Sequence, residues 1–213
     1  VVQDPNNAEG WSLAANIYLN RGNIQKALAA AEKAVALKVR GFVDEHIRPH
    51  IARWYDDAVF PREIVPELGR LGVLGMPYEG HGMPGRSAVE YGLAAQELEA
   101  GDSGLRTFVS VQGSLAMGAI HKHGSEEQKA QWLPRMTAGE AVGCSGLTEP
   151  GAGSDAGGTQ TTAVLEDGQW RINGAKEFIT NSGTDITKFV TVTAVTGERE
   201  NGKKEISTII VPS

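Results

Sequence analysis

The chain has 213 residues, enough for one large domain or two small ones, each with its own hydrophobic core. Its 40% hydrophobic and 22% charged residues are typical of globular proteins, which excludes extensive disorder and a fibrous repeat. The formal net charge of -6 disfavours a nucleic-acid surface, and no apolar stretch approaches the roughly 18 to 20 residues of a membrane helix. The single cysteine, Cys144, cannot form an internal disulfide. We therefore expect a cytoplasmic protein, or an organellar one after processing, with no nucleic-acid or membrane partner and no metal site.

Residues 1–37 predict two short helices around the turn at residues 20–23. The resemblance to a tetratricopeptide repeat rests on six positions: Trp11, Tyr18, Gly22, Ala27, Ala34 and Leu37. Such a repeat buries its apolar face only by stacking on neighbours, and one copy is present. We therefore favour a helical extension, or a leftover of an artificial or misassembled fusion, over an adaptor module. The start at Val1 instead of Met also leads us to expect an excised fragment.

Residues 38–139 predict an all-α bundle, because apolar residues recur at helical spacing in five segments. Ser125 and Gln128 have the spacing of a capping box, which predicts a helix start at that point. We interpret this segment as a second domain that follows the hairpin.

Residues 140–213 are rich in Val, Thr, Ile and Gly with alternating polarity, which predicts strands. Asp167-Gly168 and Asn201-Gly202 are typical of two-residue hairpin turns. The predicted fold class is α+β: an N-terminal α-hairpin, an all-α helical bundle, and a partial antiparallel β-barrel domain. Because the chain ends directly after a strand, we expect this third domain to be truncated.

The segment at residues 151–156, Gly-Ala-Gly-Ser-Asp-Ala, fits the Gly-x-Gly-x-x-Gly/Ala pattern of dinucleotide-binding folds. That pattern requires a helix directly after it, and residues 157–162 favour a loop that leads into a strand. We therefore reject a Rossmann site. The remaining interpretation is a Gly-rich turn whose N–H groups and hydroxyls can contact an anionic or heteroaromatic ligand.

Two segments, residues 147–155 (LTEPGAGSD) and 174–181 (GAKEFITN), together resemble paired motifs of the acyl-CoA dehydrogenases. The resemblance extends from about residue 39 to residue 213. It implies FAD as cofactor, bound by Leu147, Thr148, Gly153, Ser154, Phe178, Ile179 and Thr180. In this resemblance Thr148 hydrogen-bonds the flavin ring, Phe178 stacks beside it, and the Thr180 hydroxyl approaches flavin N5. Without the family, an aromatic residue in a Gly-flanked strand is more often core, so that alternative stays open for Phe178.

A narrower resemblance, to glutaryl-CoA dehydrogenase, rests on residues 97–99, 102–106 and 110–112. It implies that Glu99, Arg106 and Ser110 contact the terminal carboxylate of the substrate, and that Ser154 contacts acyl-CoA or the cofactor. Arg106 and Ser110 are four residues apart, which places both on one face of a helix. The alternative is an Arg–Glu pair on a solvated face with no ligand.

The resemblance implies a function: FAD-dependent α,β-dehydrogenation of an acyl-CoA thioester, which for glutaryl-CoA includes decarboxylation to crotonyl-CoA. It further implies electron-transfer flavoprotein as partner, a homotetramer, and a mitochondrial matrix location in a eukaryote. The catalytic Glu of the family belongs to a C-terminal helical domain, so we assign no catalytic residue here and expect this chain alone to be inactive. The alternative from another class is a non-catalytic helical interaction module that uses the hairpin.

Overall fold

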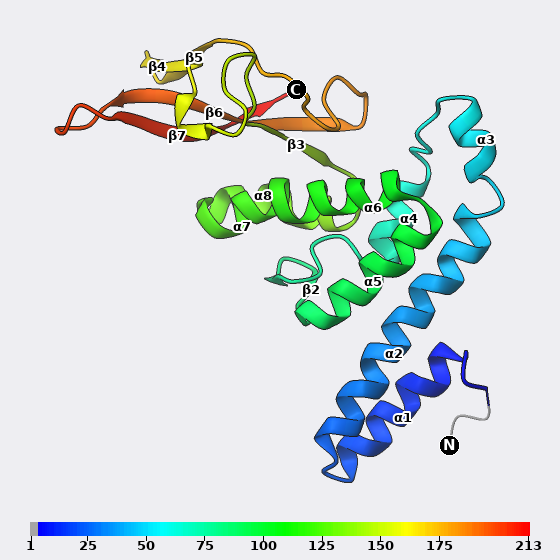
Figure 1. The fold of residues 1–213 in the computed structure, drawn as a ribbon. Helices are drawn as coiled ribbons and strands as arrows, with labels where there is room; N and C mark the ends of the chain where they lie inside the picture. Colours follow the sequence, from blue (N-terminus) through cyan, green and yellow to red (C-terminus); the bar gives the residue numbers. More distant parts are fainter. Residues whose placement is uncertain (1–3) are drawn as a thin grey trace.

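The computed structural model describes residues 4–213; residues 1–3, the start of the predicted hairpin segment, lie outside the described residues. A helical layer precedes one sheet along the chain, and the sheet lies across one side of the helices (Figure 1). This arrangement confirms a mixed α+β class with the helices first.

The first two helices, α1 (Ala8–Asn20) and α2 (Ile24–Phe42), pack against each other across a three-residue turn. The side chains of Asn7 and Asn23 cap their N-termini by accepting hydrogen bonds from backbone N–H groups. Gly22 has a φ of +72°, a left-handed conformation that favours glycine in this turn. Close packing of the two helices is possible because small residues of α2, such as Ala27 and Ala34, are buried. The likeness of this pair to a tetratricopeptide repeat stays a prediction.

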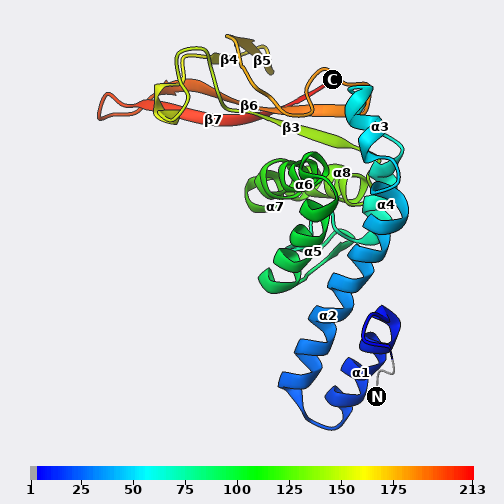
Figure 2. The ribbon, with the colours of Figure 1, turned by 45° about the vertical axis from the view of Figure 1, so that its right-hand side comes forward.

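The second helix does not end at the predicted domain boundary after residue 37. It continues to Phe42 and then into a π-helical segment, η1 (Val43–Ile47). Val39, Val43 and Ile47 are each at most 2% exposed and belong to the core of the helical layer. The N-terminal hairpin is therefore joined to the helical layer by a continuous helix, and it projects from that layer on the side away from the sheet (Figure 2).

The helical layer continues through short helices with a two-stranded ribbon between them. Its elements are α3 (Ile51–Asp56), α4 (Ile64–Leu71), β1 (Glu79–Gly80), β2 (Met83–Pro84), α5 (Ala88–Gly101), α6 (Ser103–Ser110), η2 (Val111–Met117), α7 (Gly118–His123) and α8 (Glu126–Thr137). The predicted capping box at the start of α8 is confirmed. Ser125 Oγ accepts from Gln128 N at 3.2 Å, and Gln128 Oε1 accepts from Ser125 N at 2.9 Å.

The sheet contains five strands: β3 (Val142–Gly146), β4 (Thr162–Glu166), β5 (Gln169–Asn173), β6 (Thr187–Glu198) and β7 (Lys204–Pro212). Antiparallel hairpins join β4 to β5 and β6 to β7. The two-residue turn at Asp167-Gly168 is confirmed, and both residues have the positive φ angles that it requires. Asn201-Gly202 also lies in a hairpin turn, but that turn is longer than two residues: Arg199 N donates to the carbonyl of Lys203 at 2.8 Å, and only Gly202 of the pair has a positive φ. A 3₁₀ turn, η3 (Ala156–Gly158), stands where a Rossmann site would need a long helix.

The prediction of an entirely antiparallel sheet is wrong. Strand β3 pairs with β6 in parallel, with Cys144 opposite Val190, and β4 meets β6 in parallel at Thr162 and Val195. Parallel neighbours require a long crossover, and residues 147–186 supply one that contains the β4–β5 hairpin. Within residues 4–213 the sheet is open, and the partial barrel stays a prediction.

Two buried contacts fix the sheet on the helical layer. The Gln112 side chain, which is 0% exposed, donates from Nε2 to the carbonyl of Ala141 at 2.8 Å and accepts from the N–H of Gly143 at 3.0 Å. The ring of Phe189 on β6 lies 4.6 Å, centroid to centroid, from Trp132 on α8. The Gln112 hydrogen bonds satisfy backbone polar groups at the start of β3. Together with the Phe189–Trp132 contact, they hold the sheet against the helices.

Candidate functional site

The loop after β3 and the loop after β5 lie side by side. In the first loop, Glu149 and Ala152 exchange backbone hydrogen bonds of 3.0 and 3.1 Å, which closes a tight turn. The N–H of Glu177 in the second loop donates to the carbonyl of Thr148 at 2.9 Å. The structure therefore brings together the two motifs that the sequence separates by about 20 residues.

A buried ion pair joins the same two loops. Lys176 Nζ donates to Glu149 Oε1 at 2.7 Å and to the carbonyl of Leu147 at 3.0 Å. The Glu149 carboxylate also accepts from the N–H groups of Gln160, at 2.7 Å, and Thr161, at 3.0 Å. Burial raises the pKa of Glu149, but the hydrogen bonds from Lys176 and the two backbone N–H groups outweigh it and lower that pKa to about 2. Glu149 is therefore ionised at neutral pH.

The residues predicted to bind a cofactor lie in these two loops, where Thr148 and Ile179 are half-buried and the others are exposed. Leu147, Ser154 and Thr180 are exposed, and the Phe178 side chain is 90% exposed. Phe178 also has a φ of +56°, a strained conformation for a bulky residue. The alternative that Phe178 is a core residue is therefore wrong, and residues 174–186 form a loop instead of a strand. An exposed aromatic ring with hydroxyls beside it fits an aromatic ligand with polar edges.

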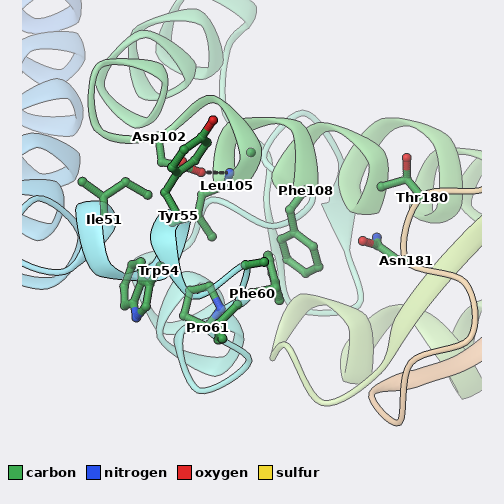
Figure 3. Close-up of a pocket in the computed structure, with 13 residues that line it drawn as sticks. Ile51, Trp54, Tyr55, Phe60, Pro61, Asp102, Leu105, Phe108, Thr180 and Asn181 are labelled. Carbon is green, nitrogen blue, oxygen red and sulfur yellow. Dashed lines mark hydrogen bonds between the residues drawn. The ribbon is translucent and has the colours of Figure 1, made fainter.

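An open cleft of about 440 Å³ connects the second loop to the helical layer (Figure 3). Thr180 and Asn181 line one side, and Leu105 and Phe108 of α6 line another. The ring of Phe60 covers Phe108 at a centroid distance of 5.2 Å. The Asn181 amide nitrogen is buried, with no hydrogen-bond partner among the described residues. The cleft therefore has mainly apolar walls, with polar groups of the predicted cofactor loop at one side.

The structure brings together two of the three residues predicted to bind a substrate carboxylate. Arg106 Nε donates to Glu99, whose other oxygen accepts from Ser103 Oγ at 2.7 Å. The hydrogen bond from Arg106, followed by that from Ser103, lowers the pKa of Glu99. The third residue, Ser110, lies one turn along α6 with its hydroxyl 3.3 Å from that of Tyr91. The Arg–Glu pair of the alternative interpretation is therefore present, and both of its side chains are partly exposed.

Lys176 and Gln112 have structural roles, and Asn181 a place in the cleft wall, that the sequence did not indicate. Lys176 belongs to the second motif. The sequence feature that could have indicated its ion pair is Glu149, an acidic residue 27 positions earlier. Asn181 also belongs to that motif, whereas nothing in the pattern around Gln112 predicted its buried hydrogen bonds. Cys144 is buried in β3, and burial raises the pKa of its thiol.

The described residues can also be searched for a metal site and for a membrane-spanning helix. In residues 4–213 no group of three or more His, Cys, Asp or Glu side chains is placed to hold a metal ion. None of the helices in the same range is long and apolar enough to span a bilayer.

Comparison with known families gives two adjacent matches. Residues 29–140 match the acyl-CoA dehydrogenase N-terminal domain, and residues 144–213 match the acyl-CoA dehydrogenase middle domain. The first match begins inside α2 and ends three residues after α8, and the second covers the sheet from Cys144 onward together with both loops. The chain belongs to the acyl-CoA dehydrogenase family.

Individual relatives agree with this assignment. A probable acyl-CoA dehydrogenase of Bacillus subtilis is 39% identical over 189 residues, which are 87% of this chain and 49% of the relative. A short-chain specific acyl-CoA dehydrogenase of Clostridium acetobutylicum is 38% identical over 185 residues, 86% of this chain and 48% of the relative. The chain thus spans about half the length of the curated relatives it matches.

Solved structures also resemble the chain. Glutaryl-CoA dehydrogenase from Mycobacterium smegmatis is 48% identical, with a TM-score of 0.81 over 93% of this chain and 49% of that one. The same enzyme in complex with FADH2 gives a TM-score of 0.79 at 48% identity, over 85% of this chain and 45% of that one. The presence of the flavin in that complex supports the prediction of FAD as cofactor.

Proposed function

We propose that this chain forms part of the FAD site and acyl-CoA site of an FAD-dependent acyl-CoA dehydrogenase. The observation that carries the proposal is the cleft between the second loop and α6, because it joins a predicted cofactor residue, Thr180, to the helix that carries Arg106. The family membership of both halves supports the same assignment.

The exposed side chains of the two loops fit a flavin. When bound, FAD supplies the acceptor for the hydride that leaves the substrate β-carbon. Thr148 and Thr180 offer hydroxyls to the polar edge of the ring system, and Leu147 and Phe178 cover apolar surface and exclude water beside it. The buried side-chain nitrogen of Asn181, which lacks a partner among the described residues, is a further donor in a residue that lines the same cleft.

We assign no catalytic base among the described residues. Three glutamates are buried, and each is already engaged in an ion pair: Glu90 with Arg86, Glu97 with Arg40, and Glu149 with Lys176. A carboxylate held in this way is a poor acceptor for the α-proton of a thioester. We therefore expect residues 1–213 alone to show no turnover with any acyl-CoA and a dye acceptor, and measurable turnover would contradict this expectation.

The narrower proposal is a substrate with a terminal carboxylate, of the glutaryl-CoA kind. It is supported by the position of Arg106 and Glu99 beside the start of α6 and by the 48% identity to the M. smegmatis enzyme. Decarboxylation to crotonyl-CoA, electron transfer to an electron-transfer flavoprotein and assembly into a tetramer belong to this proposal. A cytoplasmic or mitochondrial matrix location belongs to it as well.

Flavin binding tests the main proposal. The purified chain incubated with FAD and freed of excess cofactor is expected to retain flavin absorbance, with the flavin fluorescence quenched. Thr180→Ala should weaken retention, whereas Thr196→Ala, on β6 and hydrogen-bonded to Ser207, is the matched control and should not. A colourless protein that captures a peptide partner would instead support the helical interaction module.

A further inference from the structure

The Glu149–Lys176 pair lies where three segments of the sheet domain meet. Glu149 belongs to the loop after β3, its carboxylate accepts from the backbone that enters β4, at Gln160 and Thr161, and Lys176 belongs to the loop after β5. Lys176 also donates to the carbonyl of Leu147. One carboxylate and one ammonium group thus tie together three chain segments.

Stability alone does not explain this pair. The Glu149 and Lys176 side chains are only 5% and 12% exposed, so both lose most of their hydration on folding. Removal of two charges from water is costly, and a well-packed apolar pair is often as stable as a buried ion pair. An apolar pair could not form directional hydrogen bonds, whereas each charged group here binds particular backbone atoms.

The backbone atoms fixed in this way adjoin the predicted cofactor residues. Thr148 directly precedes Glu149, and its carbonyl accepts from Glu177 N. Phe178 directly follows Glu177 and has the strained φ of +56°. A strained conformation of this kind persists only where the surrounding structure fixes it.

We propose that Glu149 and Lys176 are positioning residues, which hold the two loops at the spacing needed for Thr148 and Thr180 to contact one flavin together. This inference rests on the proposed function, and the pair acts through the loops without touching the cofactor. Any weakening of the pair should therefore loosen both loops and lower the affinity for FAD.

The test uses the full chain and a double variant, Glu149→Gln with Lys176→Met, which leaves no unpaired buried charge. Glu149→Gln with Lys176→Gln is a milder second variant, because it removes both charges and keeps a neutral hydrogen-bonding pair. Lys176→Arg keeps the charge and two donors, and is expected to restore wild-type behaviour within about threefold. The matched control is Arg40→Met with Glu97→Gln, since that pair joins α2 to α5 away from the loops.

Amide hydrogen exchange without FAD gives the first measurement. At residues 147–149 and 176–180 we expect exchange at least about tenfold faster in the variant with Glu149→Gln and Lys176→Met, and about threefold faster in the variant with Glu149→Gln and Lys176→Gln. The control variant should leave these amides unchanged while lowering the melting temperature. The second measurement is the FAD dissociation constant from flavin fluorescence, expected to rise about tenfold in the variant with Glu149→Gln and Lys176→Met and less than twofold in the control.

Two results would overturn the inference. One is unchanged exchange at these amides in both loop variants. The other is an unchanged FAD dissociation constant and flavin spectrum in variants whose loops exchange faster. If the wild-type chain itself retains no FAD, the proposed function fails, and the exchange measurement alone then decides whether the pair fixes the loops.

Discussion

The carboxylate of Glu97 accepts hydrogen bonds from both Nε and Nη2 of Arg40, at 2.9 and 2.6 Å. Arg40 lies in the last turn of α2 and Glu97 is buried in α5, so this bidentate pair fixes the helix of the N-terminal hairpin to the helical layer. The hydrogen bond with Glu97 is also the main cause of the raised pKa of Arg40.

Replacement of Arg40 should destabilise the helical layer. Arg40→Met leaves the Glu97 carboxylate buried without its partner, which we expect to lower the free energy of unfolding by about 1–3 kcal/mol. The loss stays below that of a fully buried pair because the Arg40 side chain is about half exposed. Urea unfolding measures the loss. Arg53→Met, which breaks an exposed pair with Asp57, is the control and should change stability by less than about 0.5 kcal/mol.

The pH dependence of stability should contain a contribution from Glu149. Its pKa is lowered from the ordinary 4.5 to about 2, so the unfolded chain binds more protons than the folded one between these values. The stabilisation is therefore fully present above pH about 4.5 and is lost as the pH falls toward 2, with a slope of up to about 1.4 kcal/mol per pH unit. Thermal unfolding from pH 6 to pH 2 should show a shallower decline in Glu149→Gln than in wild type. Parallel curves for the two proteins would contradict the pKa assignment.

Phe178 should be replaceable at no cost to the fold. Its side chain is 90% exposed and its backbone is left-handed, a conformation that Asn tolerates better. We expect Phe178→Asn to leave the FAD-free chain as stable as wild type, or more stable by up to about 1 kcal/mol. Retention of FAD should fall in the same variant. A clear loss of thermal stability would mean that Phe178 packs in the folded core, against its observed exposure.

Arg106 should distinguish substrates with a terminal carboxylate. A charge-assisted hydrogen bond of about 1.5–3 kcal/mol corresponds to roughly tenfold to hundredfold discrimination. By calorimetry, Arg106→Ala should weaken binding of glutaryl-CoA by that factor and spare butyryl-CoA. Equal losses for both ligands in Arg106→Ala would make Arg106 a structural residue and remove the main support for glutaryl-CoA.

Local sequence signals predicted the parts of the fold that depend on neighbouring residues. Asp167-Gly168 formed the turn it predicts, because left-handed backbone is strongly limited by residue type. The capping box at Ser125 depends on two side chains three residues apart, so the start of α8 could also be predicted from the sequence. The loop after β3 was placed correctly by its glycines, although its ligand came from the family resemblance.

Contacts between residues far apart in the sequence could not be predicted in the same way. The parallel pairing of β3 with β6 depends on how residues 147–186 cross over, and alternating polarity carries no information about strand direction. The pairing of Glu149 with Lys176 joins positions that only the fold brings together. The exposure of Phe178 was expected from the family resemblance alone, since an aromatic residue in a Gly-flanked strand is ordinarily buried and only the loop geometry turns it outward.

The crossover between β3 and β6 leaves the C-terminal end of β3, where Gly146 lies opposite Val192, and returns to the N-terminal end of β6, where Thr187 lies opposite Val142, so it runs back along the length of β3, roughly 15 Å. Residues can be gained or lost at the β4–β5 turn without moving either end, because β4 meets β6 at Thr162 and Val195, at the end of the hairpin far from this turn. The hairpin of β4 and β5 can therefore vary in length and composition among homologues while the flanking strands keep their register. Sequence changes in this hairpin therefore leave the packing of the sheet on the helices unchanged.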